Sequence, residues 1–179
     1  MEESIILQTD RLYLREMTQE DYPSLCKMLQ DEDVMYAYAH AFSDEEAHNW
    51  LNNQIARYGR YGFGLWAVIL KKTGEMIGQC GLTIQDYNGK EVVEVGYLFQ
   101  KAHWHQGYAT EAAIACRNYA FEKLGVEEVY SIIRDNNIAS QQVAKRNGMR
   151  LCGEFVKHYY GIDMPHLVFS VKNETKCHL

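Results

Sequence analysis

The stretch EVGYLFQKAHWHQGYATEA, residues 94–112, decides the fold of this chain. Its first six residues have the pattern of a β-strand, its middle that of a loop, and its end that of a helix beginning near Gly107. The first backbone N–H groups of a helix have no partner within the helix and lie at its positive end. Such an end binds phosphate, and a glycine there lets the anion approach the backbone closely. The stretch therefore predicts an anion site, against the alternative of an ordinary joint between strand and helix.

Two familiar glycine motifs for nucleotides are absent from this stretch. It lacks the Gly-Lys-Ser/Thr ending of a Walker loop, and it lacks the three glycines of the dinucleotide fingerprint. The kind of anion must therefore be inferred from the surrounding segments.

The segments on either side predict short strands alternating with helices. Ser43-x-x-Glu46 is a capping box, Thr18-x-x-Asp21 followed by Pro23 resembles a second helix start, and Asn88-Gly89 is typical of a hairpin turn. The order indicates one mixed α/β domain over residues 1–179, with antiparallel parts in its sheet. The expected strands lie within residues 12–17, 65–70, 76–82, 92–99, 129–133, 151–156 and 167–171, and the expected helices within 18–29, 43–58, 109–124 and 140–146.

The composition excludes several classes of protein. Hydrophobic residues make up 47% and charged residues 23%, as in an ordinary globular domain, and no apolar run approaches the length of a membrane span. The 18 Lys and Arg against 24 Asp and Glu give a net charge of −6. This disfavours nucleic-acid binding, which depends on neutralising phosphates, and suits a cationic or amine-bearing partner better.

The chain start and the cysteines indicate the compartment. The acidic segment Met1 to Ser4 does not resemble a signal peptide, so we expect a cytoplasmic location. The five cysteines are scattered without a C-x-x-C pair, which indicates reduced thiols. Cys80 and Cys116 fall in apolar patterns and are expected in the core.

Five segments together resemble the GNAT superfamily of N-acetyltransferases, and within it the Rim-type branch that acetylates ribosomal-protein N-termini. The chain departs from this pattern at Lys101, where the family often has Pro, at His105, where it often has Gly, and at Met149, where Phe is usual. The loop is then less permissive, or His105 contacts a phosphate. The matching segments are TDRLYLR (9–15), MIGQCG (76–81), EVGY (94–97), WHQGYATEA (104–112), and NIASQQV (137–143) followed by Gly148-Met149.

The resemblance implies a fold and a co-substrate. The fold is a central mixed, mostly antiparallel sheet of about seven strands with about four helices, in which the fourth strand splays from the fifth in a V. Acetyl-CoA is the implied co-substrate, with its pantetheine arm in that gap and its pyrophosphate on the loop. The implied cofactor-binding residues are Leu98, Phe99, Gln106, Gly107, Tyr108, Ala109, Thr110, Asn137 and Ser140.

The implied reaction is attack of a neutral primary amine on the acetyl thioester, with the amine on a protein N-terminus or a small molecule. Many relatives carry Tyr seven residues after the equivalent of Asn137, but this chain has Ala144 there, so Ser140 is the expected proton donor to the leaving thiolate. Glu94 is the expected base, directly or through a water, against a purely structural carboxylate. The alternative function is a non-catalytic acyl-CoA-binding sensor.

The resemblance implies an acceptor pocket between the two N-terminal helices, to which residues of the sheet contribute as well. For the candidate acceptor residues, simple packing without a role in acceptor binding is an equal alternative. His103-x-His105 lacks an evident third ligand, so no metal site is expected. We expect a monomer or homodimer with no nucleic-acid or membrane partner. The candidate acceptor residues are Tyr36, Tyr38, His40, Trp66 and Tyr97.

Overall fold

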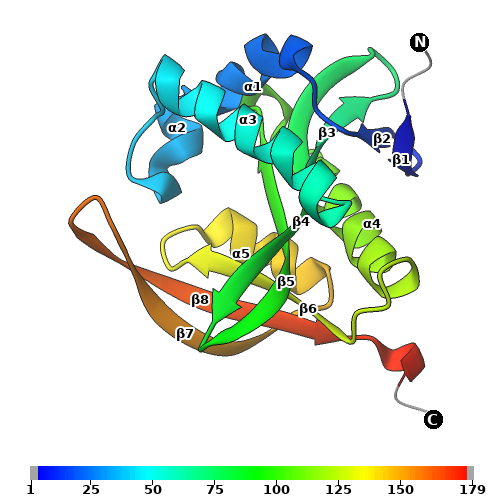
Figure 1. The fold of residues 1–179 in the computed structure, drawn as a ribbon, viewed down its shortest axis with the longest axis vertical. Helices are drawn as coiled ribbons and strands as arrows, with labels where there is room; N and C mark the ends of the chain where they lie inside the picture. The colour runs from blue at the N-terminus through cyan, green and yellow to red at the C-terminus, as the bar shows by residue number, and fades with distance from the viewer. Residues whose placement is uncertain (1–3, 177–179) are drawn as a thin grey trace.

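Eight strands form one sheet in the order β1-β2-β3-β4-β5-β6-β8-β7 in the computed structural model, which describes residues 4–176 (Figure 1). Neighbouring strands are antiparallel except β5 and β6. The strands are β1 (Ile5–Gln8), β2 (Leu12–Arg15), β3 (Leu65–Leu70), β4 (Glu75–Tyr87), β5 (Lys90–Phe99), β6 (Glu128–Arg134), β7 (Arg150–Tyr159) and β8 (Ile162–Lys172). The helices are α1 (Tyr22–Leu29), α2 (Glu32–Met35), α3 (Asp44–Tyr61), α4 (Tyr108–Glu122) and α5 (Ile138–Arg146).

Local signals in the sequence set several of these boundaries. The Ser43 hydroxyl accepts from the Glu46 N–H, and the Glu46 carboxylate accepts from the Ser43 N–H, which confirms the predicted capping box of α3. Gly62 ends the helix with a φ of 75°, a left-handed conformation that glycine adopts without strain. Asn88 and Gly89, with φ of 54° and 76°, form the predicted hairpin turn between β4 and β5.

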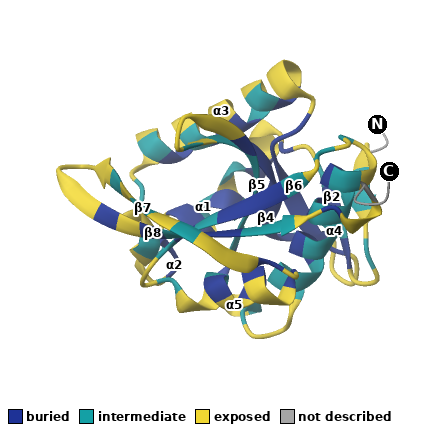
Figure 2. Ribbon diagram, turned by 90° about the horizontal axis from the view of Figure 1, so that it is seen from below, coloured by how far each residue is buried: buried dark blue, intermediate teal, exposed yellow. Residues whose placement is uncertain are grey.

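Helices cover both faces of the sheet and create two apolar cores. One core packs β3, β4 and β5 against α4, and the other packs β3 and β4 against α1, α2 and α3. All six residues of β3 are therefore buried. Figure 2 shows that the far end of the β7–β8 hairpin is by contrast mostly exposed. Cys80 and Cys116 are fully buried, as predicted. The acidic segment of residues 1–3 and Cys177 lie outside the described residues.

The mixed fold expected from the sequence is confirmed, with several differences in extent, which include the additional short helix α2 and the continuation of β4 to Tyr87. A short strand, β1, precedes the first expected strand, and α5 begins at Ile138 rather than Ser140. The hairpin of β7 and β8 is much longer than expected. Its turn at Tyr160-Gly161 is not a typical hairpin dipeptide, and Pro165, which lies within β8, usually indicates the end of a strand.

The expected splay between the fourth and fifth strands of the prediction lies between β5 and β6. These strands pair in parallel only at Val93 with Val129 and at Glu94 with Tyr130. β5 then continues to Phe99 with β4 as its one partner in the sheet, apart from the Ser131 hydroxyl of β6, which donates to the Val95 carbonyl oxygen. The far half of β5 therefore presents one open edge to the gap, on which the site is built.

Among residues 4–176, no helix is long and apolar enough to cross a membrane.

Candidate active site

Two cavities meet at the splay between β5 and β6. The first, of about 420 Å³, lies over β5, β6 and the β7–β8 hairpin, and we call it the splay cavity. The second, of about 610 Å³, lies between the end of β5, the start of α4 and α5, and we call it the helix cavity. The two share Val34, Tyr97, Leu98, Asn137 and Ser140. A molecule in one cavity would therefore meet a molecule in the other at these residues.

The helix cavity has the features that an acyl-CoA requires. β5 lines one side at Leu98 and Phe99, beyond its pairing with β6, where an extended amide-bearing chain could pair with the strand; the Phe99 carbonyl oxygen there already accepts from Trp104 Nε1. Gly107 to Thr110 line the other side. Within residues 4–176, no side chain caps the start of α4 at Gly107, so its first N–H groups are available to an anion. This cavity therefore fits a long ligand with a pyrophosphate.

The loop before α4 is anchored to the N-terminal strands. The Glu111 carboxylate accepts from the Thr9 hydroxyl at 2.6 Å and from Arg11 Nε at 2.7 Å. Arg11 also donates to the Gln106 carbonyl oxygen at 2.9 Å and lies over the Tyr108 ring. Burial alone would raise the pKa of Glu111, but the hydrogen bonds from Thr9 and Arg11 hold it below its ordinary value. Glu111 is therefore a structural carboxylate that fixes the helix start.

The backbone conformation at His105 explains why glycine is often found at this position in the family that the sequence resembles. Its φ of 60° lies in the left-handed region, two residues before Gly107 at 81°. A non-glycine residue is strained there, so the loop conformation is retained at some cost. His105 lines the helix cavity together with His103 and Arg146, which gives this cavity a basic wall.

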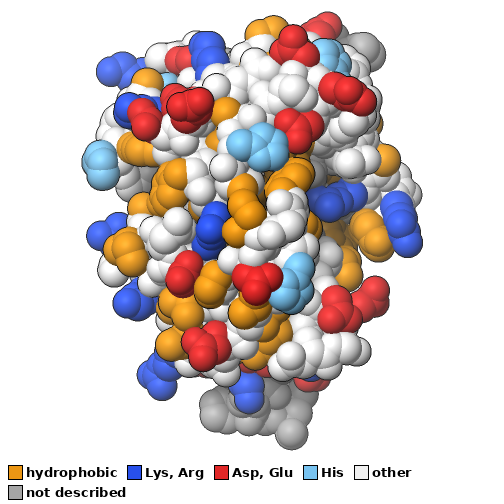
Figure 3. Space-filling view, turned by 90° about the vertical axis from the view of Figure 1, so that its left-hand side faces the viewer, with side chains coloured by type: hydrophobic (Ala, Val, Ile, Leu, Met, Phe, Trp, Pro, Cys, Tyr) orange, Lys and Arg blue, Asp and Glu red, His pale blue; other side chains and the backbone are white. Residues whose placement is uncertain are grey.

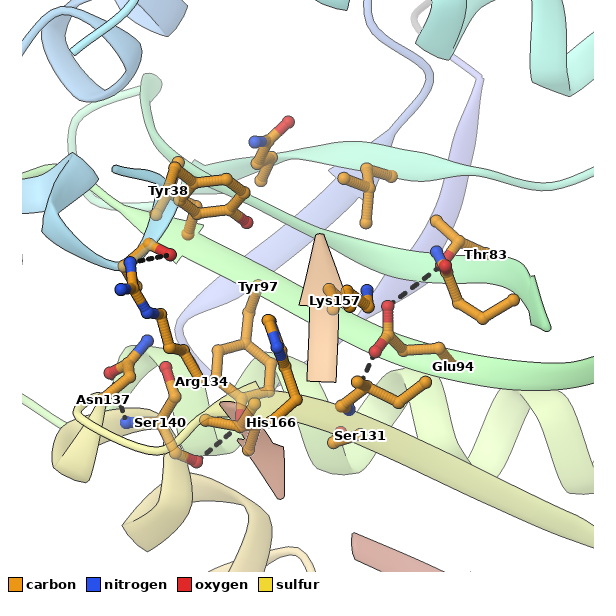
Figure 4. Close-up of a pocket in the computed structure, with 18 of the residues that line it drawn as sticks. Tyr38, Thr83, Glu94, Tyr97, Ser131, Arg134, Asn137, Ser140, Lys157 and His166 are labelled. Carbon is orange, nitrogen blue, oxygen red and sulfur yellow. Dashed lines mark hydrogen bonds between the residues drawn. The ribbon is translucent and has the colours of Figure 1, made fainter. Parts of the chain in front are cut away.

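Glu94 lies in the splay cavity, where β5 and β6 begin to separate (Figure 4). One carboxylate oxygen accepts from the Ile132 N–H at 2.8 Å, and the other accepts from the Thr83 hydroxyl at 3.3 Å. Burial raises the pKa of Glu94, although Lys157 and these hydrogen bonds oppose the shift. Glu94 therefore both ties β6 to β4 and holds a carboxylate poised to accept a proton.

His166 is a second titratable group in the splay cavity. Its Nδ1 lies 2.7 Å from the Met164 carbonyl oxygen, so Nδ1 carries the proton and Nε2 is left as an acceptor. Burial, with Lys157 and Arg134 nearby, lowers the pKa of His166, which is therefore neutral at pH 7. No pattern in the sequence indicated it, because β8 was expected to begin only at Leu167.

The junction of the two cavities carries a small polar network (Figure 4). The Tyr97 hydroxyl donates to the Ser140 carbonyl oxygen at 2.7 Å. The Asn137 side-chain oxygen accepts from the Ser140 N–H at 3.2 Å and from the Tyr36 hydroxyl at 2.9 Å. Asn137 thus caps α5 and orients Ser140, which lines both cavities.

Two residues expected in the acceptor pocket lie elsewhere. Trp66 is 1% exposed and packs edge-on against Tyr119 of α4, because β3 is buried on both faces and Trp66 points to the α4 side. His40 lines neither cavity. It bonds Glu46 at 2.9 Å and contacts the Tyr160 ring at the rim of the splay cavity.

The other residues expected in the acceptor pocket line one or both of the two cavities. Tyr38 and Tyr97 line the splay cavity, and Tyr36 lines the helix cavity. Ala144 is fully buried in the apolar core, so a tyrosine at this position would not face either cavity. The expected cofactor-binding residues line the helix cavity except Gln106, whose carbonyl oxygen is bonded by Arg11. Among residues 4–176, no three His, Cys, Asp or Glu side chains gather into a group that could hold a metal ion.

Comparison with known proteins yields one family. A family model described as an acetyltransferase (GNAT) domain matches residues 11–150. The chain is 40% identical to the uncharacterized protein YkkB of Bacillus subtilis over 145 residues, 80% of this chain and 84% of that one. It is also similar to a solved acetyltransferase from Agrobacterium tumefaciens, with a TM-score of 0.79 and 26% identity over 97% of this chain and 96% of that one. The coenzyme A complex of the ribosomal-protein α-N-acetyltransferase RimL shares the fold, with a TM-score of 0.76 at 19% identity over 94% and 98% of the two chains.

Proposed function

Because this chain belongs to the GNAT acetyltransferase family, we propose that it transfers the acetyl group of acetyl-CoA to a primary amine that binds in the splay cavity. The single observation that supports this is the meeting of the two cavities at Tyr97, Leu98, Asn137 and Ser140. One cavity suits a phosphate-bearing ligand, and the other contains acid–base groups. A non-catalytic acyl-CoA sensor would not need the second cavity to contain Glu94 and His166.

The proposed binding residues for acetyl-CoA are those of the helix cavity. The N–H groups at the start of α4 would bind the pyrophosphate, and the open edge of β5 would pair with the pantetheine arm. When bound, acetyl-CoA supplies a thioester that an amine can attack. Arg11 and Glu111 act at a distance from this chemistry, by holding Gln106 to Tyr108 in place.

The protein's task toward the acceptor is to remove a proton from its ammonium form. At pH 7 this costs about 1 kcal/mol for an α-amine with pKa ~7.7–8 and about 4.6 kcal/mol for a lysine-type amine with pKa ~10.4. Glu94 is our proposed base, and its raised pKa suits the role. Ser140 is our proposed proton donor to the leaving thiolate, whose reference pKa of ~8.5 makes this help modest in size.

A variant at the start of α4 tests the cofactor site. Gly107 is unsuitable because its φ of 81° strains any side chain. Thr110 lines the helix cavity in the first turn of α4, where a carboxylate is favourable for the helix itself but repels a bound pyrophosphate. We expect Thr110→Glu to weaken acetyl-CoA binding by about tenfold or more in calorimetry, because like charges would be juxtaposed.

Thr110→Gln has the same size without the charge and is expected to retain most of the affinity. Release of free thiol from acetyl-CoA with a panel of primary amines then tests transfer itself. If Thr110→Glu binds acetyl-CoA as well as Thr110→Gln does, the pyrophosphate lies elsewhere. If no amine in the panel releases thiol, the proposed transfer is wrong.

A further inference from the structure

We propose that the acceptor is a small-molecule amine that also carries a carboxylate or phosphate, and that Arg57, Arg134 and Lys157 select it. This inference rests on the proposed acetyl transfer and goes beyond it by naming the class of substrate. It reverses the expectation from net charge, which favoured a cationic partner.

The charge of the splay cavity is opposite to that of the chain. Three cationic side chains line it, from α3, β6 and β7, against the single carboxylate of Glu94. The whole chain has a net charge of −6. Basic side chains have thus been gathered in one place in an acidic protein, which is the arrangement expected for binding an anion. A polyamine would be repelled.

These three cations are not used in ion pairs. Arg11, Arg15 and Lys101 each bond a carboxylate. Within residues 4–176, by contrast, no carboxylate lies within ion-pair distance of the three cavity cations.

The remaining contacts of these cations are few, and Lys157 Nζ lies over the Phe155 ring at 5.8 Å from its centroid. Arg57 donates to the Gln54 side-chain oxygen at 3.2 Å, and Arg134 donates to the Ala37 carbonyl oxygen at 3.4 Å. The Nε of Arg134 is buried and lacks any hydrogen-bond partner among the described residues. A buried N–H left without an acceptor is unfavourable, and a bound anion would satisfy it.

An unsatisfied neutral donor lines the same cavity. Gln79 is 1% exposed, and its side-chain oxygen accepts from Trp50 Nε1 at 3.1 Å, which orients the amide. Its Nε2 has no hydrogen-bond partner among the described residues. An orphaned buried donor costs free energy unless a ligand accepts from it. The unused capacity of the cavity is therefore mainly donor capacity, which an anionic acceptor matches.

Glu94 leaves this anion site largely uncompensated. Its two oxygens already accept from Ile132 and Thr83, and it is one carboxylate against three cations. Lys157 and Arg57 both lie close enough to influence its pKa (Figure 4 shows Lys157 beside it). An acceptor with its amine toward Glu94 or His166 could therefore place its anionic group on these cations.

The boundary of the cavity favours a small molecule over a protein N-terminus. The His40 ring, from the loop before α3, meets the Tyr160 ring at the tip of the β7–β8 hairpin, with centroids 4.8 Å apart. Tyr160 lines the splay cavity and His40 does not, so the contact lies at the edge of the cavity. Figure 3 views the side of the molecule toward which the hairpin tip points. A volume of about 420 Å³ lies in the usual range for small-molecule sites.

Pairs of amines that differ only in the anionic group test the proposal. β-Alanine is compared with β-alaninamide, phosphoethanolamine with ethanolamine, and spermidine serves as a cationic probe. Thiol release gives kcat/KM, expressed per concentration of neutral amine so that differences in the deprotonated fraction of the amines do not enter. We expect the anionic member of at least one pair to be preferred by tenfold or more, and which pair responds identifies carboxylate or phosphate.

Replacing the cationic residues of the cavity tests whether they cause the preference for anionic amines. Arg57→Gln and Lys157→Gln should each reduce the ratio of anionic to neutral kcat/KM by fivefold or more. Arg60→Gln removes a cation from the same helix at an exposed position outside the cavity and should leave the ratio unchanged. Acetyl-CoA affinity, measured by calorimetry, verifies that each variant is folded.

Three outcomes would overturn the proposal. Neutral or cationic amines could react as well as their anionic partners, the ratio could be indifferent to Arg57→Gln and Lys157→Gln, or a short peptide beginning with the preferred amino acid could outperform that free amino acid. Absence of turnover with every amine would instead contradict acetyl transfer. Calorimetry of β-alanine and β-alaninamide against the acetyl-CoA-loaded protein would then still decide the charge preference, and equal or absent binding of both would reject it.

Discussion

Two residues, Asn137 and Tyr97, hold the backbone of Ser140 in place. Its N–H is held by Asn137 and its carbonyl oxygen by Tyr97, so the backbone is bonded on both sides while the side chain lines both cavities. This arrangement suits a donor that must be in place when the thiolate leaves.

Ser140→Ala should slow turnover by about tenfold to a few hundredfold, since one partial acid-catalysis step is removed. Its affinity for acetyl-CoA should change little, because the alanine retains both backbone hydrogen bonds. Steady-state kinetics and calorimetry on the same preparation check this. An unchanged kcat would remove Ser140 from the chemistry.

The pH dependence of the reaction rate in the Glu94→Gln variant tests whether Glu94 is the base. Burial raises the pKa of Glu94 above its ordinary value, so the active, deprotonated form is gained as pH rises through that higher folded-state pKa. The wild-type rate should therefore fall on the acid side of this pKa, once acceptor deprotonation is accounted for. The Glu94→Gln variant should lack this fall of the rate at low pH. Its loss of rate relative to the wild type should be greater for a lysine-type amine than for an α-amine.

The amide can retain both structural contacts of Glu94, because its oxygen can accept from Ile132 and its NH₂ can donate to the Thr83 hydroxyl. Thermal unfolding serves as the control and should show no loss of stability. A pH profile between 6 and 9 identical to that of the wild type would assign Glu94 a structural role only. His166, with Nε2 available, would then be the next residue to replace.

At the scale of elements, the site depends on how closely β4 approaches the start of β3. A Cβ on Gly81 would lie 2.0 Å from the Gly64 carbonyl oxygen, and that oxygen accepts from the Leu82 N–H and cannot move away. Glycine is thus required for the register that pairs Leu65 with Gly81 and brings Leu65 to the splay cavity.

We expect Gly81→Ala to destabilise the protein by about 2–3 kcal/mol and to lower Tm by roughly 5–10 °C. Gly96→Ala is the matched control on the paired strand, where the new methyl would meet only the flexible Leu65 side chain at 3.4 Å. Calorimetric melting of both variants decides the matter. Equal Tm values for the two would show that the close approach is unimportant.

At the scale of the whole molecule, segments far apart in sequence converge on one site. Thr9 and Arg11 at the N-terminus hold Glu111 at the start of α4, about a hundred positions away in the chain. Arg57, Arg134 and Lys157 come from α3, β6 and β7 and meet in one cavity. Net charge averages over all of these positions, which is why it does not predict the charge of the site.

The sequence by itself determined the fold and several local features of the site. Capping boxes, the Asn88-Gly89 turn and the loop before α4 depend on neighbouring residues, so their physics is local and readable along the chain. The same is true of Asn137, which caps α5 three residues before Ser140.

Only the tertiary structure decided what faces the splay cavity. From the sequence alone, Trp66 could not be distinguished from a pocket residue, because the direction of its side chain depends on the helices packed on both faces of β3. His166 was missed because β8 begins before Pro165, where the sequence did not predict a strand. The pKa shifts of Glu94 and His166 and the unpaired state of Arg134 arise from burial and from partners distant in sequence. These are properties of three-dimensional neighbours, and they decide the charge of the site toward its acceptor.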